Sequence, residues 1–170
     1  MSSILQFVCD AMLGRVCRWL RLLGYEVYYD PDGCDDFLIK VAEKSGGVLL
    51  TRDMHLYRRA LRHGVKAFYV ENDDFYDQFH KIACEFKLNL EIDPSRSFCP
   101  KCGGKVREAE KDEVVDHLPP SILEKYGEFW ICTSCGKTYW KGSMWKSMKK
   151  VLEKVRFKRA LGDREIFNIN

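Results

Sequence analysis

Two Cys-x-x-Cys pairs carry the most specific chemistry in this sequence. Cys99 and Cys102 form the first pair, Cys132 and Cys135 form the second, and 29 residues separate the two pairs. A glycine follows each pair, and its conformational freedom lets backbone amides turn toward the sulfur atoms. Four thiolates in two such knuckles match the tetrahedral ligand set of a structural Zn²⁺. The spacing therefore predicts a zinc ribbon rather than a thioredoxin-like redox pair.

A zinc ion held by four cysteines has no open coordination position, so we expect it to be structural rather than catalytic. Its role would be to fold a module too small to form a sufficient hydrophobic core. Aromatic side chains surround the second knuckle. They either form the core of this module or stack on nucleobases; they are Phe129, Trp130, Tyr139, Trp140 and Trp145.

Aspartates form a second candidate site, because one follows each of four short apolar runs. These four residues are Asp10, Asp30, Asp53 and Asp73. Carboxylates gathered in one cleft repel one another, and a hard cation such as Mg²⁺ or Mn²⁺ offsets that repulsion. Such ions activate water and stabilise charge on a scissile phosphate. The pattern therefore favours phosphoryl chemistry at a carboxylate-bound metal.

Helix capping is the alternative explanation for these acids, since aspartate is a favoured N-cap and each precedes an expected helix. Asp30 and Asp32 flank a proline, so we interpret them mainly as turn residues. Asp35 or Asp36 is the better ligand candidate, because the start of a helix can point back into a cleft. A second doublet adds Asp74 to the candidates.

Three arginines lie close in sequence to Asp10 and Asp53. Arg15, Arg18 and Arg52 could hold phosphate groups of a substrate bidentately. Surface charge or ion pairing with the acids would explain them equally well.

The elements that must position the aspartates alternate along the chain. Apolar runs predict strands at 4–9, 25–29, 48–51 and 66–70, and periodicity predicts helices at 12–23, 35–45, 54–63 and 74–87. Four strand–helix alternations at short spacing indicate an α/β domain with a parallel sheet covered by helices on both faces. The carboxyl ends of such strands meet at one edge, where ligands bind. That edge would bring the aspartates together.

A composition change after Pro94 marks a boundary, so we expect one domain at 1–94 and a zinc-ribbon module with a C-terminal helix at 95–170. The first part has a formal charge of −3 and the second +6. Residues 118–126 should form a short helix between the knuckles, and residues 145–161 a helix that frays after Gly162. Apolar residues at helical spacing predict a packing stripe; they are Trp145, Met148, Leu152 and Val155.

The other face of this C-terminal helix is basic. Lys146, Lys149 and Lys150, with Lys154, could follow a phosphate backbone. The whole chain has 170 residues and contains no apolar run long enough to span a membrane. Its first residues lack a secretory signal, so we expect a cytoplasmic protein with reduced thiols. Walker, G-x-G-x-x-G and G-x-S-x-G motifs are absent from the sequence.

Several of these stretches together carry a resemblance to a known family. They are DAMLGRVCRWLRLLGYEV, LLTRD, the acids of ENDDF, both knuckles, and EFWICTSCGKTYWKGSMW. In this order they resemble the C-terminal RNase domain family of Mut-seven-type exonucleases, over about residues 4 to 150. That family pairs a PIN-like nuclease domain with a zinc ribbon.

The resemblance implies a PIN-like fold and a metal-dependent ribonuclease. It implies that Mg²⁺ or Mn²⁺ is bound by Asp10, Asp35 or Asp36, Asp53, and Asp73 or Asp74. Enzymes of this kind cut single-stranded RNA with metal-activated water and leave 5′-phosphate and 3′-hydroxyl ends. Arg15 and Arg52 match family positions beside these acids, and the four knuckle cysteines carry over as zinc ligands.

This sequence departs from the family pattern in two places. Cys34-Asp35-Asp36-Phe37 stands where a more acidic run is expected, and the fourth acid falls at either residue of a doublet. Two other function classes therefore stay open. One is a non-catalytic RNA-binding or ribosome-associated zinc-ribbon protein. The other is a phosphohydrolase or phospho-acceptor fold, although Asp10-Ala-Met-Leu does not supply the DxDx[TV]-type nucleophile stretch expected after the first strand.

Overall fold

A four-stranded parallel sheet forms the first part of the fold. The computed structural model describes residues 6–71 and 74–167, with side chains described up to residue 158. The strands are β1 (Gln6–Cys9), β2 (Glu26–Tyr29), β3 (Val48–Thr51) and β4 (Ala67–Tyr69), in the order β2-β1-β3-β4. Every neighbouring pair is parallel, as predicted. The two central strands are therefore β1 and β3.

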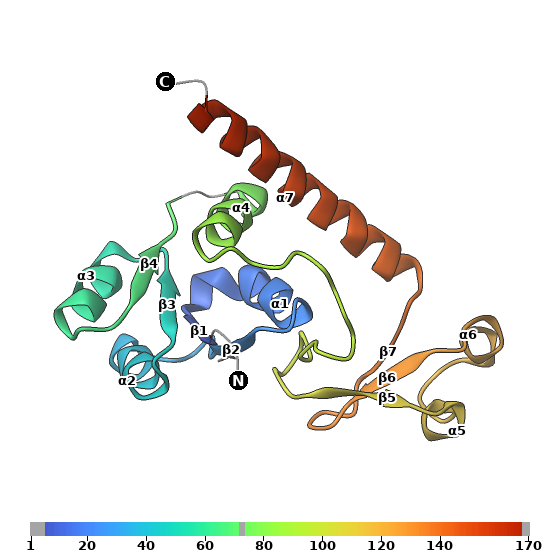
Figure 1. Cartoon of the computed structure of the whole chain (residues 1–170). Coiled ribbons are helices and arrows are strands. Elements are labelled where there is room, and N and C mark those ends of the chain that lie inside the picture. Colours follow the sequence, from blue (N-terminus) through green and yellow to red (C-terminus); the bar gives the residue numbers. More distant parts are fainter. Residues whose placement is uncertain (1–5, 72–73, 168–170) are drawn as a thin grey trace.

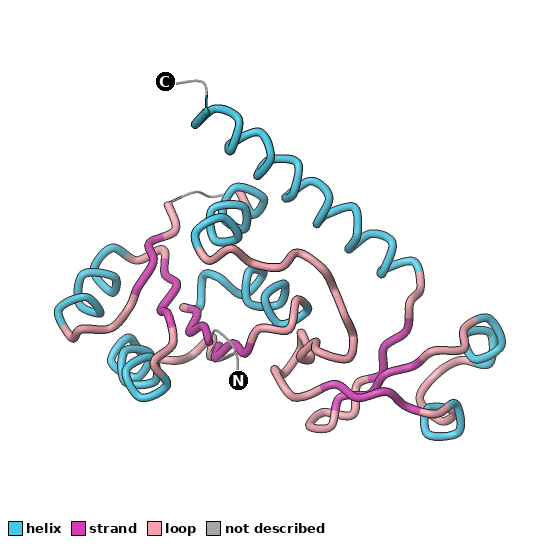
Figure 2. Tube along the Cα trace, in the orientation of Figure 1, coloured by secondary structure: helices cyan, strands magenta, loops and turns pink. Residues whose placement is uncertain are grey.

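Helices cover both faces of this sheet (Figures 1 and 2). They are α1 (Gly14–Leu22), which follows a 3-10 turn η1 (Ala11–Leu13), α2 (Asp35–Ser45), α3 (Met54–Arg62) and α4 (Phe75–Glu85). Phe7 and Leu50 face a core shared with α1 and α4, whereas Val8 and Leu49 face α2 and α3. Successive strand residues point to opposite faces, which explains why almost every strand residue is apolar.

A small antiparallel sheet forms the second part. It contains β5 (Val106–Ala109), β6 (Phe129–Cys132) and β7 (Thr138–Trp140) in that order. The stretch between the knuckles holds two short helices, α5 (Lys111–Val114) and α6 (Pro120–Lys125), and the second matches the expected helix. These elements share their own core, which includes Phe129 and Leu123.

The C-terminal helix α7 (Ser143–Phe167) follows the small sheet and packs against α4 (Figure 1). The helix expected at 145–161, with fraying after Gly162, is longer in the structure, because α7 continues through this glycine to Phe167. The packing stripe is confirmed for three of its four residues: Leu152 and Val155 are buried in the core of the parallel sheet, and Met148 packs at its edge. Trp145, the fourth, is half-buried and is not part of this core. The helix therefore joins the core of the parallel sheet, although it lies near the end of the sequence.

Candidate functional site

Asp10 lies at the carboxyl end of β1 and is held rigidly there. Only 5% of its surface is exposed. Its Oδ1 accepts a hydrogen bond from the Met12 amide at 2.8 Å, and its Oδ2 accepts one from the Arg52 amide at 2.9 Å and another from the Thr51 hydroxyl. A buried carboxylate needs such donors, because losing hydration without compensation is costly. The end of β3 therefore fixes the orientation of the acid on β1.

Asp53 follows the end of β3 and is exposed. Its amide donates to the Thr51 hydroxyl oxygen at 2.9 Å, so the buried Thr51 side chain connects Asp53 to Asp10. Its Oδ1 accepts from the His55 and Leu56 amides at 2.7 and 3.2 Å, which makes Asp53 the N-cap of α3. The capping role considered for this acid is thus present in the structure.

Asp10 and Asp53 lie at the carboxyl ends of β1 and β3, the two strands between which the strand order changes direction. The chain leaves β1 toward β2 on one side, and β3 lies on the other side of β1. In open α/β sheets, ligands bind at the carboxyl edge beside such a crossover, where the loops diverge and leave a crevice. The position of Asp10 and Asp53 is therefore that of a ligand site in this architecture.

Asp35 and Asp36 form the first turn of α2 and pair with Arg59 of α3. Arg59 Nη1 lies 3.2 Å from Asp35 Oδ2, and Nη2 contacts Asp36. All three side chains are at least 37% exposed, so the pairing contributes modestly to stability. No sequence pattern indicated Arg59, since only the packing of α2 beside α3 brings it to these acids.

Asp74 is the exposed N-cap of α4, and its Oδ2 accepts from the Asp77 amide at 3.1 Å. Because α4 follows β4, Asp74 lies at the same end of the sheet as Asp10 and Asp53. Asp73 lies outside the described residues. Asp30, interpreted as a turn residue, accepts from the Asp32 amide at 3.0 Å.

The three candidate arginines differ in their surroundings. The Arg15 guanidinium lies 4.0 Å from the ring centroid of Phe75, the first residue of α4. Arg15 and Arg18 are exposed, and Arg52 is half-buried beside Asp10. Arg15 therefore joins the start of α1 to the start of α4.

The described carboxylates are not gathered as closely as metal ligands. Within the ranges 6–71 and 74–167, four cysteines form the one group of three or more His, Cys, Asp or Glu ligand atoms that all lie within 4.8 Å of each other. The strand-end acids supply carboxylate oxygens, the donor type that Mg²⁺ and Mn²⁺ prefer. The carboxylate oxygens at the carboxyl edge of the sheet are therefore of the right chemical type for such an ion. Among the described residues, no three of them lie within 4.8 Å of one another.

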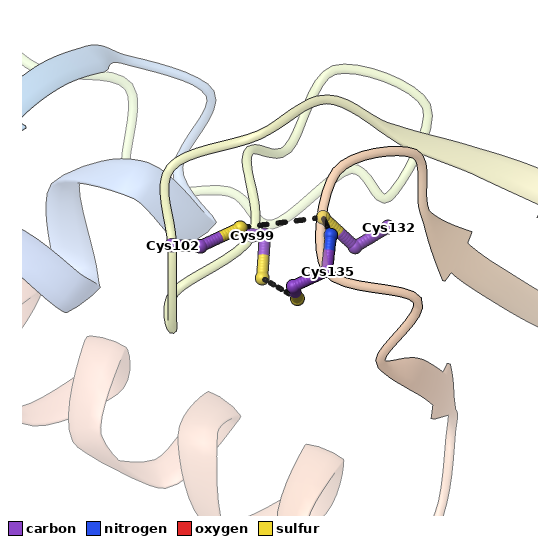
Figure 3. Close-up of side chains that lie close together, drawn as sticks. All are labelled: Cys99, Cys102, Cys132 and Cys135. Carbon is purple, nitrogen blue, oxygen red and sulfur yellow. Dashed lines mark hydrogen bonds between the residues drawn. The ribbon is translucent and has the colours of Figure 1, made fainter.

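The cysteine group has the geometry of a tetrathiolate zinc site. Cys99 Sγ lies 3.7 Å from Cys135 Sγ, and Cys102 Sγ lies 3.5 Å from Cys132 Sγ (Figure 3). Tetrahedral zinc with bonds of about 2.3 Å places its sulfur ligands about 3.8 Å apart. The four residues predicted as zinc ligands are therefore brought together at a spacing that fits the ion.

Both knuckles turn through a glycine with a positive φ, at 78° for Gly103 and 71° for Gly136. The Gly104 amide donates to Cys102 Sγ at 3.4 Å, and the Cys135 amide donates to Cys132 Sγ at 3.5 Å. Amide donors of this kind stabilise thiolate charge. The glycines thus serve the turn that the sequence pattern indicated.

Tyr139 on β7 lies against the cysteine group, with its hydroxyl 2.9 Å from Cys99 Sγ. Burial raises the pKa of the Cys99 thiol, but hydrogen bonds from Tyr139 and the backbone outweigh burial and lower that pKa to about 6. A lowered pKa favours the thiolate, which is the form that binds zinc. Tyr139 is therefore half-buried against the cysteine group rather than exposed as a base-stacking residue would be.

The first knuckle packs on the end of α1. The Phe98 amide donates to the Arg21 carbonyl at 2.8 Å, and the Ser97 hydroxyl donates to the Leu22 carbonyl at 2.6 Å. The buried Arg21 guanidinium lies directly behind Gly103. The four-cysteine group is thus joined to the helix layer of the parallel sheet by hydrogen bonds that no sequence motif indicated.

The other aromatic and basic candidates divide between packing and surface. Phe129 and Trp130 are buried, which favours the structural role for these two rings. Lys146, Lys149 and Lys150 are exposed on α7, and Lys149 and Lys150 line different surface grooves. No helix in the described part of the chain has the length and apolar character required to cross a membrane.

One comparison with known proteins identifies the family. The family model described as the Mut7-C RNAse domain matches residues 5–152. No curated protein and no solved structure matches the chain. The chain therefore belongs to the Mut7-C RNase domain family, as its sequence resemblance indicated. Membership implies a nuclease that acts on RNA.

Proposed function

We propose that this protein is a metal-dependent ribonuclease that hydrolyses phosphodiester bonds of single-stranded RNA at the carboxyl edge of the parallel sheet. The observation that carries the proposal is the hydrogen-bonded link from Asp10 through the Thr51 hydroxyl to Asp53. This link lies at the carboxyl ends of the neighbouring strands β1 and β3. A rigid acid beside an exposed one, in a family of RNase domains, supports a ligand site there.

In this proposal Asp10 and Asp53 hold Mg²⁺ or Mn²⁺, with Asp35 or Asp36 and Asp73 or Asp74 as further carboxylates around the site. Such an ion supplies activation of water and stabilisation of phosphate charge when bound. Asp10 provides a carboxylate whose orientation does not have to be reorganised, because three donors hold it. Arg15 is exposed at the α4 side and binds a flanking phosphate.

The four-cysteine group holds a structural Zn²⁺ in this proposal. Its closed ligand set leaves no position for substrate, so the module supports the nuclease domain through the hydrogen bonds at the end of α1. A cytoplasmic location stays a prediction.

A non-catalytic RNA-binding protein is the second candidate, and a specific observation favours it. Asp53 and Asp74 each cap a helix, and Asp35 and Asp36 pair with Arg59. These interactions explain the acids without a metal ion. The two candidates differ in whether purified protein cleaves RNA and whether cleavage requires added metal.

The deciding experiment measures cleavage of labelled single-stranded RNA, with and without Mn²⁺, by the wild type and by Asp53→Asn. Asparagine is as good an N-cap as aspartate, so this variant keeps α3 while it removes the charge. We expect Mn²⁺-dependent products from the wild type and a loss of at least about 10²-fold in the variant.

Asp30→Asn is the matched control, since it makes the same charge change at the end of β2, where the side chain serves a turn. It should cleave like the wild type. Equal cleavage by wild type and Asp53→Asn would place the activity elsewhere. RNA binding without any cleavage would support the second candidate.

A further inference from the structure

Three lysines on α7 form a row beside the first turn of α4. Lys150, Lys154 and Lys158 are spaced four residues apart, so they lie on one face of the helix. With Glu153, Tyr76 and Phe157 they line a shallow groove between α4 and α7, two helices that pack against each other (Figure 1). We call this surface the α4–α7 groove.

Two aromatic rings accompany the lysines in the α4–α7 groove. Phe157 is 66% exposed, so the face of its ring is accessible to a ligand. Tyr76 is half-buried, and Lys154 Nζ lies 5.3 Å from the centroid of its ring. Lysines interleaved with accessible rings are typical of surfaces that bind single-stranded nucleic acid by phosphate contact and base stacking.

Side-chain contacts connect the α4–α7 groove to Arg15, which lies five residues after Asp10 in the chain. The rings of Tyr76 and Phe75 pack together with their centroids 5.5 Å apart. The Arg15 guanidinium lies over the Phe75 ring. Arg15 belongs to the first turn of α1, which follows Asp10 by way of η1. A strand of RNA leaving the Asp10 edge over Arg15 would therefore arrive at Tyr76.

The charge of the α4–α7 groove complements a phosphate backbone. Its lining contains three lysines and one acid, Glu153. Lys158 pairs with Asp77, but both side chains are about 40% exposed. Exposed ion pairs are weak, so a phosphate can replace Asp77 as the partner of this lysine.

We propose that the α4–α7 groove binds the single-stranded segment of the RNA substrate that flanks the scissile phosphate. Lys150, Lys154 and Lys158 contact consecutive parts of the backbone, and a base stacks on Tyr76 or Phe157. This inference rests on the proposed ribonuclease function for the direction of the RNA, but its binding component can be measured separately.

The first test changes the three lysines together to glutamine and measures affinity for a fluorescent single-stranded RNA by anisotropy. Mg²⁺ and Mn²⁺ are omitted so that the RNA stays intact, and no chelator is added, so that zinc is retained. Each lost phosphate contact lowers the salt slope of the logarithm of affinity by about 0.7. We expect the triple variant to lose about 2 from that slope.

The matched control changes Lys40, Lys44 and Lys66 to glutamine. These lysines are equally exposed but lie on α2 and before β4, away from α7. The control should keep the wild-type slope, because it removes the same net charge without touching the groove. Equal slopes for the two triple variants would overturn the proposal.

The second test concerns base stacking. Phe157→Ser removes an exposed ring, so folding should not suffer, and we expect affinity for single-stranded RNA to fall on the order of ten-fold. Affinity for a double-stranded RNA of the same length, whose bases are already stacked, should change little. Unchanged affinity for the single strand, or an equal loss for both, would overturn the stacking part.

Cleavage assays on the same proteins separate the two proposals. If the wild type cleaves RNA and the lysine variant cleaves it with unchanged kcat/KM, the groove proposal fails and the nuclease stands. If the lysine variant loses binding while the wild type shows no cleavage, the groove stands as an RNA-binding surface and the nuclease fails.

Discussion

Thr51 connects the two acids of the candidate site, so replacing it tests the site geometry directly. Its hydroxyl donates to Asp10 and accepts from the Asp53 amide, and its side chain is fully buried. Thr51→Val keeps the shape of the side chain and removes both hydrogen bonds. Thr51→Ser keeps the hydroxyl and removes one buried methyl group.

The expected loss of stability follows from these contacts. A hydrogen bond to a charged group contributes about 1.5–3 kcal/mol, and the orphaned Asp53 amide adds up to about 1 kcal/mol. We therefore expect Thr51→Val to lower the free energy of unfolding by about 3 kcal/mol. In a chain of 170 residues that corresponds to a fall in Tm of about 6–12 °C. Thr51→Ser should cost about 1 kcal/mol, the value of one buried methyl group.

Denaturant unfolding and RNA cleavage are the two measurements. If Asp10 and Asp53 act together, the valine variant should also lose on the order of 10²-fold in kcat, because a displacement of about 1 Å at a reacting centre has that effect. The serine variant should retain most of the activity. A valine variant as stable and active as the wild type would refute the link between the two acids, and equal damage in both variants would assign the effect to packing.

Three further predictions concern the zinc module and the surface pairs. Cys132→Ser should lower the zinc content measured by elemental analysis from one ion per chain to none, and should lower Tm, because the four thiolates form one closed site. Gly103→Ala should lower the free energy of unfolding, measured in urea, by about 2 kcal/mol, since φ is +78° and the new Cβ would lie 2.9 Å from Arg21 Nη2. Gly127→Ala is the control: no atom lies within 4 Å of its Cβ, so its free energy of unfolding should stay within about 1 kcal/mol of the wild type. Arg59→Gln should lower the free energy of unfolding by less than about 1 kcal/mol, because its ion pairs are exposed; a larger loss would indicate that the repulsion between its two partner acids is stronger than their exposure implies.

The α7 helix shows how far local patterns reach. The spacing of its apolar residues predicted the face that is buried, and Leu152 and Val155 are buried as expected. The end of the helix was misplaced, because one glycine weakens a helix without ending it. What the helix packs against had no local signal, since the partner residues on α1 and α4 lie some 70 residues or more away in the chain.

By itself the sequence determined the strand–helix alternation, the acids at the strand ends and the four cysteines of the metal group. These features depend on spacing over a few residues. Such spacing can be recognised in the sequence, because helices and strands have fixed periods and metal ligands have characteristic residue types. The tertiary structure alone decided that β1 and β3 are neighbours, that Thr51 joins Asp10 to Asp53, that Arg59 pairs with Asp35 and Asp36, and that α7 lies along α4. Each of these contacts joins segments distant in the chain, and it forms because burying the apolar faces of whole elements brings those segments together.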